Sequence, residues 1–455
     1  MTEKECPSKR QKLLYITWGI LAVLPFFLIF NNNVWFDETY TLALIRHDYG
    51  DIIRILKSDM HPPLYFVSLK LFCELFGYSM EVTKIFSILG YEGSLLLGIT
   101  LIRKHFGHRT AFFYLLITGA VPMNFYFSVQ QRSYSWSFCF VALCFVSALL
   151  VLQHHKPHYY ILMTAGGLLA GYNHIFSLLA VGLVFLFLNV YTLIRERKQL
   201  WKLLLADLAM VLGYLYWLMP LLMQTRAAAQ NFWQDGPDPY SISSFVFGIL
   251  VCAVLLIKPQ NRSRTIAFAM VCVLGIQAIG LGVTFLYKPL YIARYGAVIM
   301  GIFCLMTAIG LTAFSVRTQK IVCAVLTAML VISYAYAAYL EYNPSAGDFL
   351  SRNSQRISGT DTFLYTDSAF GIAAYYFPDN PHLSTENESW YEAFGNVDCV
   401  TREEALRLTK DKPVWYIRFA GKKLPGYIQD HFRYERLDTF TCDLNSFEFY
   451  RLEQK

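Results

Sequence analysis

Charged residues are scarce in this sequence, and their scarcity excludes most soluble folds. Only 16% of the 455 residues are Asp, Glu, Lys or Arg, whereas 55% are hydrophobic and the mean hydropathy is +0.38. A soluble globular protein carries about 25% charged residues. The composition therefore indicates a membrane protein that crosses the bilayer many times.

The sequence also lacks C-x-x-C pairs, internal repeats and low-complexity segments. Most of its ten cysteines fall inside apolar runs, where a thiol is ordinary packing, although Cys399 and Cys442 could pair. The net charge of +7 comes from short basic clusters between apolar runs. Such clusters set membrane orientation, so we expect no nucleic-acid partner.

Eleven apolar runs approach the roughly 20 residues that a helix needs to cross a hydrocarbon core of about 30 Å. They cover residues 13–30, 85–102, 111–127, 134–152, 159–172, 175–194, 203–223, 240–257, 266–286, 291–314 and 321–340. The fifth run is short, and only Asn173 and His174 separate it from the sixth. The first run follows a basic segment without a small-residue cleavage site, so we interpret it as a retained helix.

The positive-inside rule gives an independent check on this count. With the N-terminus in the cytoplasm, every basic cluster falls in a predicted inner loop. These clusters are Arg103, Lys104 and Arg109, then Lys156, then Arg195, Arg197, Lys198 and Lys202, then Lys258, Arg262 and Arg264, and finally Arg317 and Lys320. The agreement supports eleven spans and predicts that the region from about residue 341 lies outside the cytoplasm.

Two segments outside the spans have patterns of their own. Residues 341–455 are polar and contain the alternating runs TFLYT, VWYIRF and SFEFY and the helical pattern REEALRLTK, which predict a small extracytoplasmic α/β domain. The first outer loop, 31–84, has helical spacing in ETYTLALI and in LYFVSLKLFCELFG, and we expect interfacial helices there. The predicted fold is mainly α: a polytopic transmembrane bundle, 1–340, followed by this domain.

Acidic, imidazole and guanidinium side chains gather at the outer ends of the predicted spans, beside Asp37 and Glu38 in NNNVWFDETY. Arg294 lies inside the start of an apolar run, where a charge usually has a partner or a function. It could instead snorkel to the interface. Arg132 is similar, and two such cations on one face favour an anionic ligand such as a phosphate.

The two acids have a structural and a functional interpretation. They could cap the helix that follows, whose N-terminus favours negative charge. A carboxylate base facing phosphate-binding cations is also the minimum apparatus for moving a group from a phosphate to a hydroxyl. His61, before Pro62-Pro63, and His174, between two spans, could likewise be structural.

The motifs WFDETY, HPPLYF, P-x(5)-S-x-Q-x-R-x-Y, YNHIF, LMPLLMQ and KPLYIARY occur in this order. Together they resemble membrane glycosyltransferases of the GT-C superfamily, over the whole chain. The pattern is most similar to the bacterial glycosyltransferase family 39 group, including protein O-mannosyltransferases and the aminoarabinose transferases that modify lipid A. In the aminoarabinose branch a Glu-Lys pair precedes Pro-Pro, whereas this chain has Met60-His61, so a metal ligand of that branch is missing.

The resemblance implies inverting transfer of a sugar from a polyprenyl-phosphate donor to an acceptor hydroxyl on the outer face of the plasma membrane. Asp37 would be the general base and Glu38 would position or polarise it. The donor phosphate would bind Arg132, Arg294, Lys288 and His61. Further substrate contacts would come from Tyr40, Gln130, His174, Gln224 and Tyr295. No cofactor is certain, a divalent cation stays open, and the acceptor is a glycan, a lipid or a protein.

Two other functions compete with this interpretation. A transporter or lipid flippase also places charges in its spans. However, the chain has no inverted repeat, and its polar residues lie at one face instead of the midplane. A sugar-lipid binding protein without activity is the second alternative, against which the intact Asp37 argues.

Overall fold

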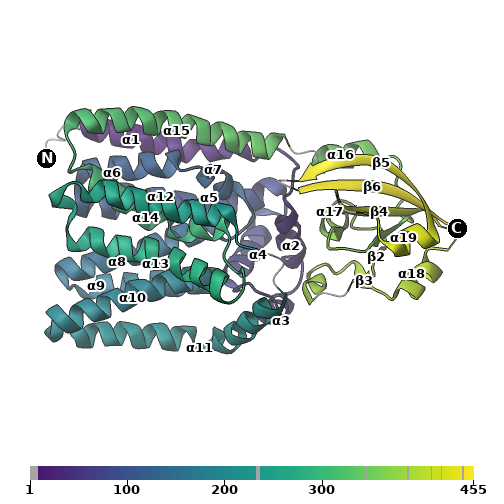
Figure 1. Ribbon diagram of the computed structural model, residues 1–455, viewed down its shortest axis with the longest axis horizontal. Coiled ribbons are helices and arrows are strands. Elements are labelled where there is room, and N and C mark those ends of the chain that lie inside the picture. Colours follow the sequence, from purple (N-terminus) through teal and green to yellow (C-terminus); the bar gives the residue numbers. More distant parts are fainter. Residues whose placement is uncertain are drawn as a thin grey trace.

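The computed structural model describes residues 9–231, 236–343, 346–386, 389–410, 412–421, 423–442 and 445–455. Long helices form a bundle at one end of the molecule, and a sheet domain lies at the other, with three short helices between them (Figure 1). The predicted basic N-terminal segment lies mostly outside the described residues.

Each of the eleven apolar runs forms a helix in the bundle. The helices are α1 (Lys9–Val23) with η1 (Leu24–Leu28), α5 (Met80–Leu97) with η2 (Gly98–Ile102), α6 (Arg103–Ala120), α8 (Tyr134–His154), α9 (Pro157–Asn173), α10 (Ile175–Arg195), α11 (Leu200–Asn231), α12 (Pro239–Leu256), α13 (Arg264–Leu286), η5 (Ala293–Ile299) with α14 (Met300–Leu311), and α15 (Val316–Tyr342). A short helix, α7 (Asn124–Val129), precedes α8.

Nine stretches of the described chain are long and apolar enough to cross a membrane. The difference from eleven lies in two places. Met80–Ala120 is one stretch of 41 residues that contains the predicted second and third spans, and α9 has only 17 residues. The predicted inner loop at 103–109 is helical, and the chain turns there at Gly107, whose φ of 85° is accessible to glycine.

The first outer loop contains three helices: α2 (Phe36–Leu44), α3 (Tyr49–Ser58) and α4 (Leu64–Phe76). The predicted helical patterns correspond to α2 and α4, and α4 begins directly after His61-Pro62-Pro63. The sequence patterns missed α3, which buries Ile52, Ile55 and Leu56.

The sheet domain has six strands in the order β3-β2-β1-β4-β6-β5. The strands are β1 (Thr362–Tyr365), β2 (His382–Ser384), β3 (Val397–Cys399), β4 (Val414–Phe419), β5 (Phe432–Cys442) and β6 (Asn445–Gln454). The helical elements are α16 (Ala346–Asn353), α17 (Phe370–Tyr376), η6 (Ser389–Ala393), α18 (Arg402–Leu408) and α19 (Gly426–His431). Strands β3, β2, β1 and β4 pair in parallel, and β6 is antiparallel to β4 and β5.

The predicted runs TFLYT, VWYIRF, SFEFY and REEALRLTK correspond to β1, β4, β6 and α18, which confirms the α/β prediction. The suggested pairing of Cys399 with Cys442 is wrong, because the two residues lie on strands at opposite edges of the sheet and form no disulfide. Cys399 is exposed on the edge strand β3, whereas Cys442 is buried on the opposite edge strand β5. The Cys442 thiol donates to the Val34 carbonyl at 2.7 Å.

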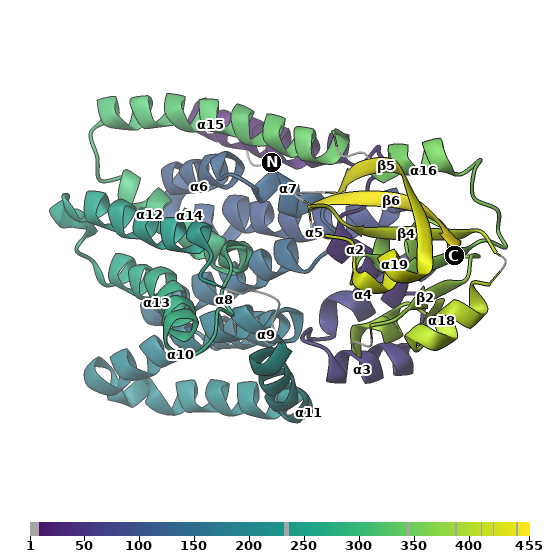
Figure 2. The same cartoon turned by 45° about the vertical axis from the view of Figure 1, so that its right-hand side comes forward.

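The sheet domain packs against α2, so one apolar core continues from the first loop into the domain. The Phe36 ring lies 5.6 Å from that of Phe419 and 6.2 Å from that of Phe447. A Cβ added at Gly371 of α17 would lie 2.5 Å from Thr39 Oγ1. In both cartoon views α2 lies between the bundle and the sheet domain (Figure 2).

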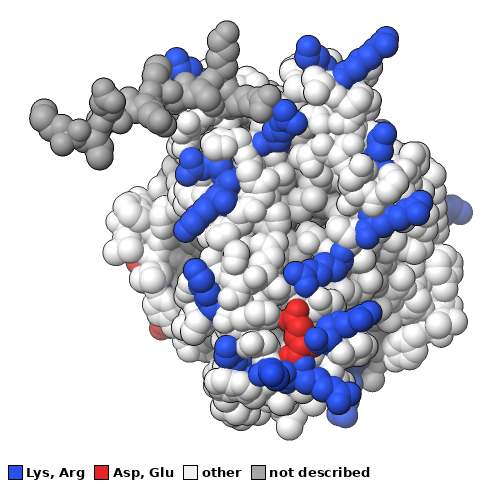
Figure 3. Space-filling model, turned by 90° about the vertical axis from the view of Figure 1, so that its left-hand side faces the viewer, with Lys and Arg blue, Asp and Glu red and all other residues white. Residues whose placement is uncertain are grey.

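The basic loops gather at the end of the bundle opposite the sheet domain. The Tyr159 hydroxyl and His105 Nε2 are 3.3 Å apart, and Arg264 donates to the Tyr191 hydroxyl at 2.7 Å, which joins three of these loops. Lys and Arg side chains are spread over this end, and acidic side chains are few (Figure 3). The charge asymmetry expected from the sequence is therefore present along the axis of the bundle.

Candidate active site

The structure brings Asp37 and Arg294 together. Asp37 is in the first turn of α2, and Arg294 is in η5, before the tenth predicted span. Arg294 Nη1 donates to Asp37 Oδ2 at 2.8 Å, and the two side chains are 24% and 23% exposed, so a substrate can reach both. Arg132 lies on the other side, where its Nη1 donates to the Asp37 carbonyl oxygen at 3.3 Å.

The surroundings keep Asp37 ionised. Burial by itself raises the pKa of the Asp37 carboxyl, but the charges of Arg294 and Arg132 lower it more strongly, and the net pKa lies below the usual value. Asp37 is therefore a carboxylate at neutral pH, as a proton acceptor must be.

A chain of hydrogen bonds fixes Arg132. Its Nη2 lies 2.7 Å from His61 Nε2, and because a guanidinium only donates, Nε2 must be the acceptor. The His61 proton is then on Nδ1, which donates to Asp59 Oδ2 at 2.7 Å. The Tyr40 hydroxyl donates to the same oxygen at 2.6 Å.

Asp59 is a site residue that the sequence analysis missed. Burial raises the pKa of its carboxyl, but the hydrogen bonds from His61 and Tyr40 oppose this rise, and the pKa lies below its usual value. An acid two residues before the His of His-Pro-Pro was the only available signal. Asp59 orients His61 and, through it, Arg132.

Glu38 has a different environment from its neighbour Asp37. It is 3% exposed; its Oε2 accepts from the Trp35 backbone N–H and its Oε1 from the Gln131 N–H, each at 2.7 Å. Burial raises the pKa of Glu38, and the charge of Lys84 opposes this rise. Glu38 thus caps α2 and joins it to the segment that carries Arg132.

Aromatic rings surround the other side of Arg294. Its guanidinium lies 5.1 Å from the Trp35 ring centroid and 5.9 Å from that of Tyr295. The His174 ring is 5.5 Å from the Tyr295 ring, and His174 Nδ1 accepts from the Phe176 N–H at 3.2 Å, which caps α10. His174 Nε2 therefore carries the proton and is a donor.

Comparisons with known proteins agree with this arrangement. Residues 60–217 match the family model described as dolichyl-phosphate-mannose-protein mannosyltransferase. The crystal structure of ArnT from Cupriavidus metallidurans in the apo state superposes with a TM-score of 0.66 at 14% identity, over 98% of both chains. The chain therefore has the fold of this ArnT structure.

A second solved structure gives the same result. ArnT from Cupriavidus metallidurans bound to undecaprenyl phosphate matches with a TM-score of 0.65 at 14% identity, over 97% of this chain and 98% of that chain. No curated protein matches the sequence of this chain. The family-model match includes His61, Arg132 and His174, whereas Asp37 and Arg294 lie outside it.

The remaining predicted site residues have other positions. Gln224 Nε2 donates to the Leu56 carbonyl at 2.7 Å and to the His61 carbonyl at 3.4 Å, so it holds the α3–α4 connection. Lys288 is partly exposed in the segment between α13 and η5. Gln130 is 1% exposed at the end of α7.

Three buried polar side chains in this region have atoms that lack a hydrogen-bond partner within the described part of the chain. They are the side-chain amide of Gln130, Oε1 of Gln224 and Nε of Arg294. An unmet buried polar group costs about 1–3 kcal/mol, and more when it is charged. The unpaired donors among them suit a polar, anionic ligand.

The same residues do not suit a divalent cation. Within the described ranges, no group of three or more His, Cys, Asp or Glu side chains is arranged to hold a metal ion. The Asp37 carboxylate is already paired with Arg294, and Arg132 adds a second positive charge beside it. We therefore derive no step through a metal.

Proposed function

We propose that the chain transfers a sugar from a polyprenyl-phosphate-linked donor to an acceptor hydroxyl, with inversion and with Asp37 as the general base. The observation that carries this proposal is the Asp37 carboxylate paired with Arg294, with the Arg132 guanidinium at the Asp37 backbone carbonyl. One of the ArnT structures has undecaprenyl phosphate bound, which supports a polyprenyl phosphate as the carrier.

The two Asp37 oxygens have separate roles in this mechanism. Oδ2 accepts from Arg294, whereas Oδ1 accepts no hydrogen bond from the described residues. The acceptor hydroxyl gives its proton to Oδ1 while its oxygen attacks the anomeric carbon. The bond from that carbon to the phosphate oxygen breaks, and its electron pair leaves with the polyprenyl phosphate. Attack opposite the leaving group inverts the anomeric centre.

The cations act on the leaving phosphate. Phosphate is a good leaving group, so the step needs no general acid, and stabilisation of the developing negative charge dominates. The buried Arg294 Nε has no partner among the described residues and can donate to a phosphate oxygen. Arg132, held by His61 and Asp59, supplies the second positive charge, and the His174 Nε2–H is a further donor.

The positions of the charges support an orientation in the plasma membrane. Basic loops lie at the end of the bundle opposite the sheet domain, and the positive-inside rule assigns that end to the cytoplasm. Residues 1–340 are then the transmembrane catalytic domain. Residues 341–455 lie outside, over the helix that carries Asp37, where an acceptor approaches from the aqueous side.

Purified protein in vesicles with radiolabelled polyprenyl-phosphate sugars tests the proposal. We expect Asp37→Asn to lower the transfer rate about 10²- to 10⁴-fold, as loss of a general base does, with the fold intact. Asp51→Asn, a change to an exposed acid on α3, is the matched control and should keep the wild-type rate. The anomeric configuration of the product, read by NMR, reports inversion.

Three results would contradict the proposal. Transfer by Asp37→Asn at the wild-type rate would exclude Asp37 as the base. Transbilayer movement of a fluorescent polyprenyl phosphate by wild type, without consumption of any donor, would instead support the flippase alternative. Retention of configuration would contradict direct attack by the acceptor.

A further inference from the structure

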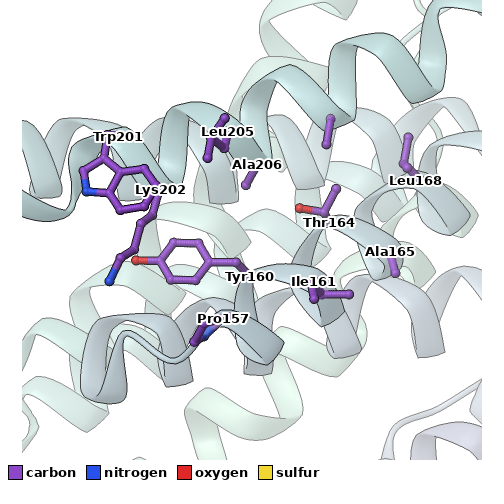
Figure 4. A pocket seen from close by; sticks show the side chains of 11 residues that line it. Pro157, Tyr160, Ile161, Thr164, Ala165, Leu168, Trp201, Lys202, Leu205 and Ala206 are labelled. Atoms are coloured by element: carbon purple, nitrogen blue, oxygen red, sulfur yellow. The ribbon is translucent and has the colours of Figure 1, made fainter.

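A groove runs along the outside of the bundle between α9 and α11, far from the Asp37 site. Its volume is about 500 Å³. Figure 4 shows side chains of both helices facing this space. The lining residues are Pro157, Tyr160, Ile161, Thr164, Ala165, Leu168, Trp201, Lys202, Leu205, Ala206 and Ala209. We call this feature the α9–α11 groove; its lining is almost entirely apolar.

Glycine packing explains why the groove opens at one end only. A Cβ at Gly213 of α11 would lie 2.8 Å from the Leu168 side chain, and one at Gly171 of α9 would lie 3.0 Å from Leu178 and 3.2 Å from Tyr214. The Tyr172 hydroxyl donates to the Gly213 carbonyl at 2.9 Å. The two helices therefore touch near the Asp37 end and leave space toward their N-terminal ends, where the basic loops lie.

Positive charge stands at the open end of the groove. In Figure 4 Trp201, Lys202 and Tyr160 gather at one end, and Leu168 lies at the other. Lys202 Nζ is 5.7 Å from the Trp201 ring centroid, and no described carboxylate lies within ion-pair distance of it. Lys156 and Lys198, just before α9 and α11, are exposed nearby in sequence.

We propose that the α9–α11 groove binds an anionic phospholipid, with an acyl chain along its apolar floor and the phosphate at Lys202. Basic pockets between transmembrane helices at the cytoplasmic side suit anionic headgroups. The Lys202 stem can extend along the groove while its ammonium reaches the headgroup level, and Trp201 and Tyr160 suit the same level. A zwitterionic lipid would fill the groove equally well, but the cation in its headgroup would offset the phosphate charge that Lys202 meets.

Quenching of Trp201 fluorescence tests the proposal in nanodiscs of the full chain. Brominated-chain phosphatidylglycerol is compared with brominated-chain phosphatidylcholine at equal mole fraction, and subtraction of the Trp201→Phe signal isolates Trp201 among the eight tryptophans. We expect stronger quenching by phosphatidylglycerol. Lys202→Gln should weaken this preference roughly five-fold, as the loss of one basic contact predicts. Lys320→Gln, which removes an exposed charge from α15, outside the groove, is the charge control and should keep the preference.

A volume variant tests the groove itself. Ala165→Phe fills the groove and should remove most of the Trp201 quenching, whereas Leu212→Phe, at a position of α11 that is 60% exposed and does not line the groove, should not. Equal quenching of wild type by both lipids would overturn the proposal. A preference that survives both Lys202→Gln and Ala165→Phe would also overturn it.

A competition arm separates the phospholipid from the proposed sugar donor. Unlabelled phosphatidylglycerol should relieve the quenching in proportion to its mole fraction, and undecaprenyl phosphate should act no more strongly. If undecaprenyl phosphate relieves the quenching at a far lower mole fraction, the occupant is a polyprenyl chain and the assignment to a phospholipid is wrong.

Discussion

At the scale of single residues, the ion pair of Asp37 and Arg294 has two effects. It keeps Asp37, the proposed base, ionised, and it places a guanidinium at the proposed phosphate site. Because Arg294 would contact both in the proposed mechanism, we expect arrival of the phosphate to weaken its hold on Asp37. The carboxylate should then become a stronger proton acceptor when the donor is bound.

This coupling gives a prediction for Arg294→Gln. In wild type the pKa of Asp37 lies below its usual value, so transfer should stay constant from neutral pH to about pH 5 and fall only as the pH drops through that lowered pKa. Without the Arg294 charge, the rise that burial causes in the pKa of Asp37 is less opposed. The acidic limb of the pH profile should therefore move up by about 1 to 3 pH units. The pH dependence of kcat/KM for both forms measures this, with Arg226→Gln as a charge-matched control. An unshifted limb with a lower plateau would mean that Arg294 binds phosphate without tuning Asp37.

Asp59 predicts a second effect at this scale. The Asp59 carboxylate now accepts hydrogen bonds from both Tyr40 and His61. Asp59→Asn leaves a single neutral carbonyl oxygen in its place, so His61 no longer orients Arg132. Hydrogen bonds to charged groups contribute about 1.5–3 kcal/mol, and we expect a fall in transfer of roughly 10- to 100-fold. The double variant Asp59→Asn/Arg132→Gln should be no slower than Arg132→Gln alone. Additive losses would show that Asp59 acts independently of Arg132.

The charged residues of the site were easier to predict from the sequence than the residues that hold them in place. Arg294 and Arg132 were recognisable because a cation in an apolar run is costly. Asp59 carried no comparable signal, since an acid in a polar loop is ordinary. Glu38 was expected to position or polarise Asp37 and Gln224 to contact substrate, and the structure places both in hydrogen bonds that hold backbone segments. Such support depends on tertiary contacts, which no local pattern encodes.

At the scale of elements, the spans were predictable because the bilayer fixes their length. The break between the second and third spans was not, because a single glycine turn replaces the expected loop. Helix α3 was missed because its buried apolar face consists of only three residues, Ile52, Ile55 and Leu56. The strands were visible from alternation, but the docking of α17 against α2 depends on one close approach, at Gly371.

That approach makes Gly371→Ala informative. The added methyl would meet Thr39 Oγ1, and α17 and α2 must separate or Thr39 must give up its hydrogen bond to the Phe36 carbonyl. We expect about 1–3 kcal/mol lower stability and slower transfer, because α2 carries Asp37. Thermal unfolding measures the first effect, and Thr39→Ala should suppress both when combined with Gly371→Ala. Gly359→Ala, where a Cβ meets nothing within 4 Å, is the control. Failure of Thr39→Ala to restore the double variant would contradict this contact.

At the scale of the whole molecule, one buried ion pair joins the two ends of the transmembrane chain. Lys84 Nζ, at the start of α5, lies 2.7 Å from Glu341 Oε2 at the end of α15, and the side chains are 1% and 7% exposed. Asn31 adds a hydrogen bond to each partner, and Asn33 donates to the Glu341 carbonyl and accepts from Gly347 N–H. The asparagines that follow the first span thus fasten the sheet domain to the bundle.

Removal of one partner should be costly, and the cost should depend on pH. Lys84→Met leaves the Glu341 charge buried, which costs about 3–5 kcal/mol. Lys84 also opposes the rise that burial causes in the pKa of Glu38, so this pKa rises further in the variant. An acid whose folded pKa lies above its unfolded value stabilises the fold at low pH and loses that contribution as the pH rises past the unfolded value. Lys84→Met should therefore lose stability as the pH rises from about 4.5 toward 8.

Unfolding in denaturant at several pH values, in detergent micelles, checks this prediction. The double variant Lys84→Met/Glu341→Met removes both charges and should regain most of the stability, because an apolar pair often replaces a buried ion pair at little cost. It should also be less dependent on pH than Lys84→Met, since the charge of Glu341, which raises the pKa of Glu38, is gone. A single variant as stable as wild type at every pH would show that Lys84 and Glu341 do not hold the sheet domain over the site.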